Sequence, residues 1–245
     1  MLLAAEIQEI PLARLALLVL PLGVVFFYLV RFGVGTRRAG WGLVRMLGQL
    51  LIIGYFLKYL FEATNAWPVL GVLVVMVFAA SWIALGTVGS ERPRLFRRAL
   101  FAIMLSGVLN LALVTAGVLH LDPWYLPSKV IPLAGMIFAS SMNSISLAAE
   151  RFFSERKNGA PVSDARRTAY NAALIPIVNT LFAVGLVSIP GMMTGQILAD
   201  VSPLIAARYQ ILVMMMLLGA SGIASAMFLQ GLVRDEEARV AHAVQ

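Results

Sequence analysis

Apolar residues are gathered in long runs that short polar segments separate. Crossing a bilayer as a helix takes roughly 18 or more consecutive, mostly apolar residues. Seven runs approach or exceed that length: 12–32, 43–61, 69–88, 99–120, 130–152, 173–190 and 204–232. The pattern predicts an all-α, polytopic membrane protein with seven transmembrane helices, the last of which is long enough to extend beyond the membrane.

The composition strengthens this prediction. Hydrophobic residues make up 60% of the 245 residues and charged residues 13%, and the mean hydropathy is +0.88. The segments between the runs are short, so we expect a single transmembrane domain over residues 1–245. The first run follows Glu6 and Glu9 without a basic leader, which indicates a retained span rather than a removable signal peptide. The lack of cysteine excludes disulfides, thiolate metal sites and cysteine nucleophiles.

Basic residues are distributed unevenly between the two sides of the predicted membrane. With the N-terminus outside, 15 of the 19 lysines and arginines fall on inner loops and the C-terminal tail. The positive-inside rule therefore predicts an N-out, C-in orientation in the cell membrane. Trp67, Trp124 and Tyr125 then lie near the outer boundary, where an aromatic belt is expected. Orientation accounts for the pI of about 10.2 without any nucleic-acid partner.

Helix punctuation predicts several boundaries. Asn65 and Pro68 separate the second and third runs, while Ser202 as N-cap and Pro203 at the first helical position begin the last. Residues 31–48 contain five glycines mixed with arginine and tryptophan, which predicts an interfacial loop instead of a helix. Pro190-Gly191 is expected to end the sixth helix, giving a broken sixth span.

Two neighbouring runs carry polar residues at matching depth. Ser140, Asn143 and Ser144 are three and four residues apart and share one face of the fifth run, while Asn179 and Thr180 occupy the sixth. Such residues are costly in hydrocarbon unless they meet a partner or a cavity. A substrate path is one interpretation, and hydrogen bonding between closely packed helices is the other.

The segment after the predicted break is polar and rich in glycine and methionine. Non-helical backbone at membrane depth persists only where protein buries it or where it lines a watery cavity. We therefore expect a short re-entrant or interfacial segment that gates the outer end of a pathway, with an ordinary connecting loop as the alternative. The gate residues are Pro190, Gly191, Met192, Met193, Thr194, Gly195 and Gln196.

The stretch "LVSIPGMMTGQILADVSPLIAARYQI" resembles the marked segment of the FetB-type permeases, and "IPLAGMIFASSMNSISLAAERF" is similar to their second one. These are ABC transporter membrane subunits linked to bacterial iron export and related to plant aluminium-tolerance permeases. The resemblance implies a homodimeric permease joined to two copies of a separate ATP-binding subunit. This chain has no Gly-x-x-x-x-Gly-Lys-Ser/Thr phosphate loop, so we expect no cofactor of its own, with ATP and Mg²⁺ on the partner.

The longest inner segment lies between the fifth and sixth runs. Gly159, Ala160 and Pro161 predict a turn, and Ser163-Asp164 a possible N-cap for a short helix that contains Arg166 and Arg167. By analogy with other ABC permeases, Gly159, Ala160, Asp164, Arg166 and Arg167 are candidates for ATPase coupling. The family usually has Ala-Leu-Gly-Ala where this chain has "KNGA". A solvated basic loop, or one that binds anionic headgroups, is the alternative.

Other functional classes fit less well. An enzyme needs catalytic groups at one depth, yet the only histidines are His120 and His242, and no carboxylate pair falls in mid-membrane. The last run has no lysine for a retinal Schiff base. No ligand set for a metal is visible, and the twelve methionines are more typical of packing than of ligation. A neutral polar metabolite as the substrate, or an ATPase-independent channel, stays open.

Overall fold

The computed structural model describes residues 10–62 and 65–243. The regular elements described there are helical, apart from one isolated bridge between Val184 and Ser188. This confirms the all-α prediction. The chain divides into two compact units, Met1–Glu62 and Ala63–Gln245. The expected outer loop after the second run includes Ala63 and Thr64, which lie outside the described residues, as do Glu6 and Glu9.

The first unit is a pair of helices. A short helix α1 (Leu12–Leu15) and a 3-10 turn (Ala16–Leu18) lead into α2 (Val19–Arg31), and α3 spans Thr36–Phe61. The prediction of an interfacial loop over residues 31–48 was wrong, because α3 begins at Thr36. Of the five glycines in this stretch, only Gly33 has a positive φ, which is 69°, and it lies in the turn that follows α2. The later glycines are tolerated in α3, where a helix satisfies every backbone group in an apolar environment.

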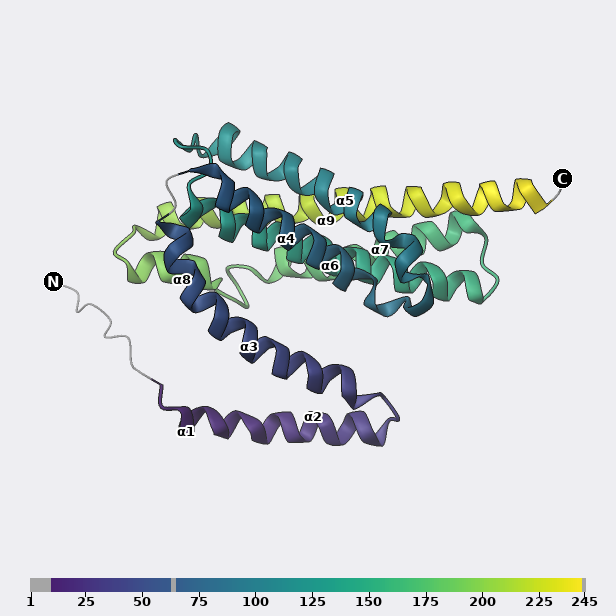
Figure 1. Ribbon diagram of the computed structural model, residues 1–245, viewed down its shortest axis with the longest axis horizontal. Coiled ribbons are helices and arrows are strands. Elements are labelled where there is room, and N and C mark those ends of the chain that lie inside the picture. The colour runs from purple at the N-terminus through teal and green to yellow at the C-terminus, as the bar shows by residue number, and fades with distance from the viewer. Residues whose placement is uncertain (1–9, 63–64, 244–245) are drawn as a thin grey trace. The chain divides into compact units, whose positions relative to one another are not determined.

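The second unit is a bundle (Figure 1) of five long helices and one short one. The helices are α4 (Ala66–Ala84), α5 (Arg92–Ala112, continued by a π-helical turn over Leu113–Val118), α6 (Pro127–Lys157), α7 (Val162–Ala183), α8 (Gly191–Leu198) and α9 (Pro203–Ala243). Two 3-10 turns, Leu85–Thr87 and Gly89–Glu91, join α4 to α5. Helix α6 packs against α4, α5, α7 and α9, so it is the centre of the bundle.

Small residues allow these helices to approach closely. On α7, Ala165, Ala169 and Ala173 are four residues apart and fully or almost fully buried, and Ala220 and Ala224 repeat the spacing on α9. Without a hydrophobic driving force between helices in lipid, close backbone packing and interhelical hydrogen bonds hold such bundles together. The bundle therefore packs along small side chains, with large apolar ones filling the space between.

Within residues 10–62 and 65–243, six helices are long and apolar enough to cross a membrane: those containing α2, α3, α4, α5, α6 and α9. The chain is a multi-pass membrane protein. Helix α7 falls outside this set, since its first turns carry Asp164, Arg166 and Arg167, and the seventh span and the orientation stay predictions. The start of α4 beside Asn65, the start of α9 at Pro203 and the length of α9 agree with the sequence.

The break after the sixth run lies at a different place than predicted. Helix α7 ends at Ala183, seven residues before Pro190, so Pro190-Gly191 does not end it. Gly185, with φ of 83°, is in the turn, and the backbone N–H groups of Val187 and Ser188 donate to the Ala183 carbonyl at 2.8 and 3.2 Å. Pro190 is instead the N-cap residue of α8, which is regularly helical from Gly191.

The connection between α6 and α7 is a tight turn. Helix α6 continues to Lys157, Gly159 has a φ of 85°, and α7 starts at Val162. The expected turn at Gly159 is confirmed. No separate short helix follows it, because residues 162–183 form one helix. Pro161 occupies the N-cap position, so the prediction of Ser163-Asp164 as the N-cap was wrong.

Candidate functional site

A groove of about 350 Å³ opens among α6, α7 and α9. Its polar side chains are Ser140, Asn143 and Ser144 on α6, Thr180 on α7 and Ser221 on α9. The remaining wall is formed by Met136, Ala139, Leu147, Ala173, Pro176, Ile177 and Leu217. Four hydroxyls and one amide thus face the groove among apolar side chains, and none of the described lining residues is charged.

The serines of this groove also join the helices. The Ser140 and Ser221 hydroxyl oxygens lie 2.6 Å apart. The buried Ser144 hydroxyl lies 3.2 Å from the carbonyl oxygens of Ala173 and of Ser221, so its single donor is shared between α7 and α9. Ser144 is thereby committed to packing, while Ser140 keeps part of its surface exposed to the groove.

The two candidate asparagines behave differently. Asn143 is exposed and lines the groove, whereas Asn179 is exposed but is not part of its lining. Thr180 lines it while its hydroxyl donates to the Pro176 carbonyl at 2.8 Å. Of the five predicted path residues, the fold brings four to one groove. The sequence interpretation did not include Ser221, although its place in the small-residue run "GASGIASA" indicates a helix contact.

The seven predicted gate residues belong to α8 and its N-cap, Pro190. Gly191 and Gly195 are helical, and an added Cβ would meet nothing within 4 Å at either position. Within this chain, neither glycine is required by a positive φ or by close packing. Thr194 is exposed and donates from its hydroxyl to the Pro190 carbonyl at 3.2 Å, and Met192 packs against the hydrophobic core.

Pro190 and Met193 line a second cavity of about 470 Å³ that α7, α8 and α9 enclose. Its lining is mostly apolar and includes Met214 and Met215 of α9. Gln210 is the polar exception: it is 6% exposed and its Oε1 accepts no hydrogen bond among the described residues. The buried Oε1 of Gln196 on α8 is in the same situation. The α8 region thus combines apolar surface with two buried amides.

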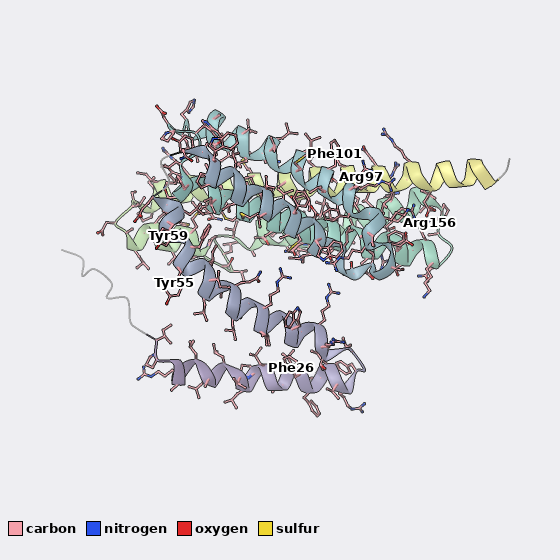
Figure 2. All side chains as sticks on the ribbon, viewed as in Figure 1. Phe26, Tyr55, Tyr59, Arg97, Phe101 and Arg156 are labelled. Atoms are coloured by element: carbon pink, nitrogen blue, oxygen red, sulfur yellow. The ribbon has the colours of Figure 1, made fainter. Side chains whose placement is uncertain are left out.

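The turn between α6 and α7 is fixed to α9 by an arginine that sequence interpretation missed. Arg156 (Figure 2) donates from Nη2 and Nε to one carboxylate oxygen of Glu236, at 2.8 and 3.1 Å. Its Nη1 donates to the Ala160 carbonyl at 2.7 Å. One side chain thereby joins the end of α6, the turn and the C-terminal part of α9. The residues are 80 apart in sequence, so no local pattern indicates the pair.

The other coupling candidates lie beside this turn. Asp164, Arg166 and Arg167 are exposed on the first turns of α7, and Gly159 and Ala160 lie in the turn itself. Arg166 and Arg167, with Tyr170, also line a shallow groove of about 320 Å³ against α9. The fold therefore collects all five candidates at one end of α7.

The described part of the chain forms no cluster of metal ligands. Among the described residues, no three His, Asp or Glu side chains lie close enough together to hold a metal ion. The groove among α6, α7 and α9 offers hydroxyl and amide oxygens in place of charged ligands. Such a lining suits a weakly held polar solute better than a tightly bound ion.

Residues 11–235 match the model of a protein family described as an uncharacterised protein family, UPF0014. The chain belongs to the UPF0014 family. This match extends from the start of α1 into the C-terminal part of α9, so it includes most of both units and all the predicted path, gate and coupling residues. No solved structure matches the chain.

Several curated relatives are similar to this chain over most of their length. A UPF0014 membrane protein of Synechocystis sp. is 37% identical over 198 residues, which are 75% of this chain and 76% of the relative. The probable iron export permease protein FetB of Escherichia coli is 32% identical over 76% of each chain. The protein ALUMINUM SENSITIVE 3 of Arabidopsis thaliana is 28% identical over 72% of this chain and 69% of its own. The predicted family resemblance is confirmed.

Proposed function

We propose that this chain is the membrane-spanning permease subunit of an ABC transporter that exports iron or a related metal. The observation that carries the proposal is the similarity to a probable iron export permease over three quarters of both chains. ATP hydrolysis takes place on a separate ATP-binding subunit, and two copies of this chain form the pathway in the cell membrane. The N-terminus faces outward and the C-terminus inward, as the basic residues indicate.

In this proposal the α6–α7 turn transmits the ATPase cycle to the bundle. The cluster of Asp164, Arg166 and Arg167 is exposed and charged, as a docking element has to be. The Arg156–Glu236 pair supports the role, because a force on the turn acts directly on α9. Helix α9 in turn supplies Ser221 to the polar groove, so one rigid helix joins the turn to the path.

The substrate passes along the α6–α7–α9 groove and leaves beside α8. The uncharged lining also fits a second substrate class, a neutral polar metabolite. Hydroxyl and amide groups hydrogen-bond such a solute without any charged side chain. A metal ion crosses this lining only with low affinity, or as a chelate that carries its own ligands. A metal ion and a neutral metabolite are distinguished by which of them stimulates ATP hydrolysis.

The test uses the full chain co-purified with the ATP-binding subunit from the same organism and reconstituted in vesicles. Fe²⁺ should stimulate ATP hydrolysis and be moved across the membrane, and Arg166→Glu with Arg167→Glu should abolish both while leaving membrane insertion unchanged. Stimulation by a neutral solute and not by metals assigns the second substrate class. Transport without any ATPase identifies a channel and overturns the proposal.

The orientation has its own test, because the chain contains no cysteine. Single cysteines at Asn65, Asp122, Gly159 and Asp235 report their side through an impermeant thiol reagent applied to intact cells. The first two should be labelled and the last two should not. Labelling of Gly159→Cys in intact cells contradicts the N-out, C-in arrangement and with it an ATPase docked at the α6–α7 turn.

A further inference from the structure

A second polar groove lies between α5 and α9, away from the groove among α6, α7 and α9. It has a volume of about 640 Å³. Its lining is Arg94, Arg97, Arg98, Phe101 and Ala102 from α5 and Met227, Gln230, Gly231 and Arg234 from α9. Four of these nine described residues are arginines and none of the nine is acidic, so the groove has a positive potential.

Two of the arginines have defined neighbours. Arg94 forms an ion pair with Glu91 at 2.9 Å, so Arg97 and Arg234 contribute most of the remaining positive charge. Gly231 accommodates Arg98: a Cβ at Gly231 would lie 3.2 Å from the Cδ of that arginine. The missing side chain thus lets an arginine of α5 lie against α9.

The groove lies at the end of two apolar segments. Residues Gly89–Val118 and Pro203–Arg234 are each long and apolar enough to cross a membrane. The three α5 arginines are near the start of the first segment, and Arg234 ends the second. Guanidinium groups at these positions reach the level of the lipid headgroups. In the proposed orientation this is the inner leaflet, whose anionic lipids attract basic residues.

An exposed apolar stripe continues from the arginines along α5. Arg97, Phe101, Met104 and Val108 are spaced by four, three and four residues, which places them on one face of the helix. Phe101, Met104 and Val108 are 54%, 44% and 57% exposed. Figure 2 shows Arg97 and Phe101 on adjacent turns of α5. A ligand that fits this surface has an anionic end and a long apolar tail.

We propose that the α5–α9 groove binds an anionic phospholipid, with its phosphate against Arg97 and Arg234 and one acyl chain along the α5 stripe. Guanidinium groups match phosphate oxygens in geometry and charge, and basic pockets between membrane helices are suited to such headgroups. Free inorganic phosphate shares the headgroup chemistry but makes no use of the stripe. The proposal needs neither transport nor an ATPase, so it stands or fails separately from the proposed function.

The test measures lipid binding to the purified full-length chain in detergent by native mass spectrometry. Phosphatidylglycerol should be retained at concentrations where phosphatidylcholine is not. Arg97→Gln and Arg234→Gln should each weaken phosphatidylglycerol binding about fivefold, and the double variant about 25-fold. Arg208→Gln is the matched control, since Arg208 is an exposed arginine on α9 outside the groove. It should leave the affinity unchanged.

A second arm separates a lipid from a free anion and from a protein. Phe101→Ala removes part of the stripe and should weaken phosphatidylglycerol binding about threefold. Equal binding of phosphatidylglycerol and phosphatidylcholine overturns the proposal. Displacement of the lipid by millimolar inorganic phosphate, with no effect of Phe101→Ala, identifies a free-anion site instead. Unchanged lipid binding by the Arg97→Gln/Arg234→Gln variant, with loss of ATPase co-purification, identifies a protein docking surface.

Discussion

The two units have similar apolar character and opposite burial. The window Ala13–Arg31 of the first unit has a mean hydropathy of 2.3, close to the 2.5 of Ala66–Thr87 in the second. None of the residues in the windows of the first unit is buried within the structure, whereas in the second unit between 33% and 50% are. Hydropathy therefore indicates insertion into the membrane and says nothing about helix packing.

Small and hydroxyl-bearing residues account for the difference. The bundle joins its helices through Ser106, Ser141 and Ser144, whose hydroxyls donate to carbonyls of neighbouring helices. The glycines of α3 meet open space, apart from Gly40 beside Phe26. Where small residues allow close approach, a helix exchanges lipid contacts for protein contacts. The first unit, taken by itself, leaves its apolar surface uncovered.

Among the glycine variants, the largest effect is expected from Gly107→Ala on α5. A Cβ at Gly107 would lie 2.5 Å from Cε1 of Phe138, whose ring is buried on α6. Overpacking of this kind destabilises a core by about 1–3 kcal/mol. We expect a lower yield of monodisperse protein and a lower melting temperature in detergent, measured by fluorescence-detected size exclusion during a thermal ramp.

Gly48→Ala on α3 is the matched control. An added Cβ there meets nothing within 4 Å, and alanine is a better helix former than glycine. The melting temperature should stay the same or rise. Equal losses at both positions would show that the contrast between the two units does not hold in the membrane-extracted protein.

The second prediction compares two glycines beside the α7–α8 break. Gly185 has a φ of 83°, where an L-residue costs about 1–2 kcal/mol, while Gly195 is helical with open space around it. Gly185→Ala should therefore lower the melting temperature, and Gly195→Ala should leave it unchanged or raise it. Transport per folded protein is measured for both variants after reconstitution in vesicles. Normal stability of Gly185→Ala would contradict the location of the break.

This pair of glycines also shows where sequence interpretation stops. The apolar runs predicted the helices, and the turn at Gly159 follows from local chemistry. The position of the α7–α8 break cannot be predicted in the same way, because Gly185 and Pro190-Gly191 are equally plausible as helix ends in the sequence. The choice between them depends on backbone hydrogen bonds to Ala183, which no composition reveals.

The groove among α6, α7 and α9 was also only partly predictable from the sequence. Helical spacing correctly placed Ser140, Asn143 and Ser144 on one face of α6, and equal depth brought Thr180 of α7 near them. The rotation of α7 about its axis is set by packing against α6 and α9, so Asn179 lies outside the groove. Ser221 and the Arg156–Glu236 pair come from α9, whose place in the bundle is a matter of tertiary packing.

The third prediction concerns that ion pair. Arg156→Gln removes two charge-assisted hydrogen bonds to a partly buried carboxylate and leaves Glu236 without its partner. Because both side chains keep some solvent exposure, the loss of stability should be about 1 kcal/mol. If the pair links the turn to α9, ATP hydrolysis should lose its stimulation by substrate at an unchanged basal rate. Arg151→Gln, which removes a pair with Glu155 four residues along the same helix, is the control.

The smallest effect is expected in the first unit, and it tests the difference in burial between the two units most directly. Leu51 and Ile52 of α3 are 70% and 72% exposed, and lipid tails are as apolar as either side chain. Leu51→Ala and Ile52→Ala should therefore change the melting temperature by little, equivalent to less than about 0.5 kcal/mol. Ile137→Ala in the bundle core is the contrast, since loss of a fully buried isoleucine costs about 2–5 kcal/mol. The dimer fraction, measured by single-molecule photobleaching in nanodiscs, tests whether this surface of α3 packs against a second copy. A fall in the α3 variants supports that packing, and an unchanged fraction contradicts it.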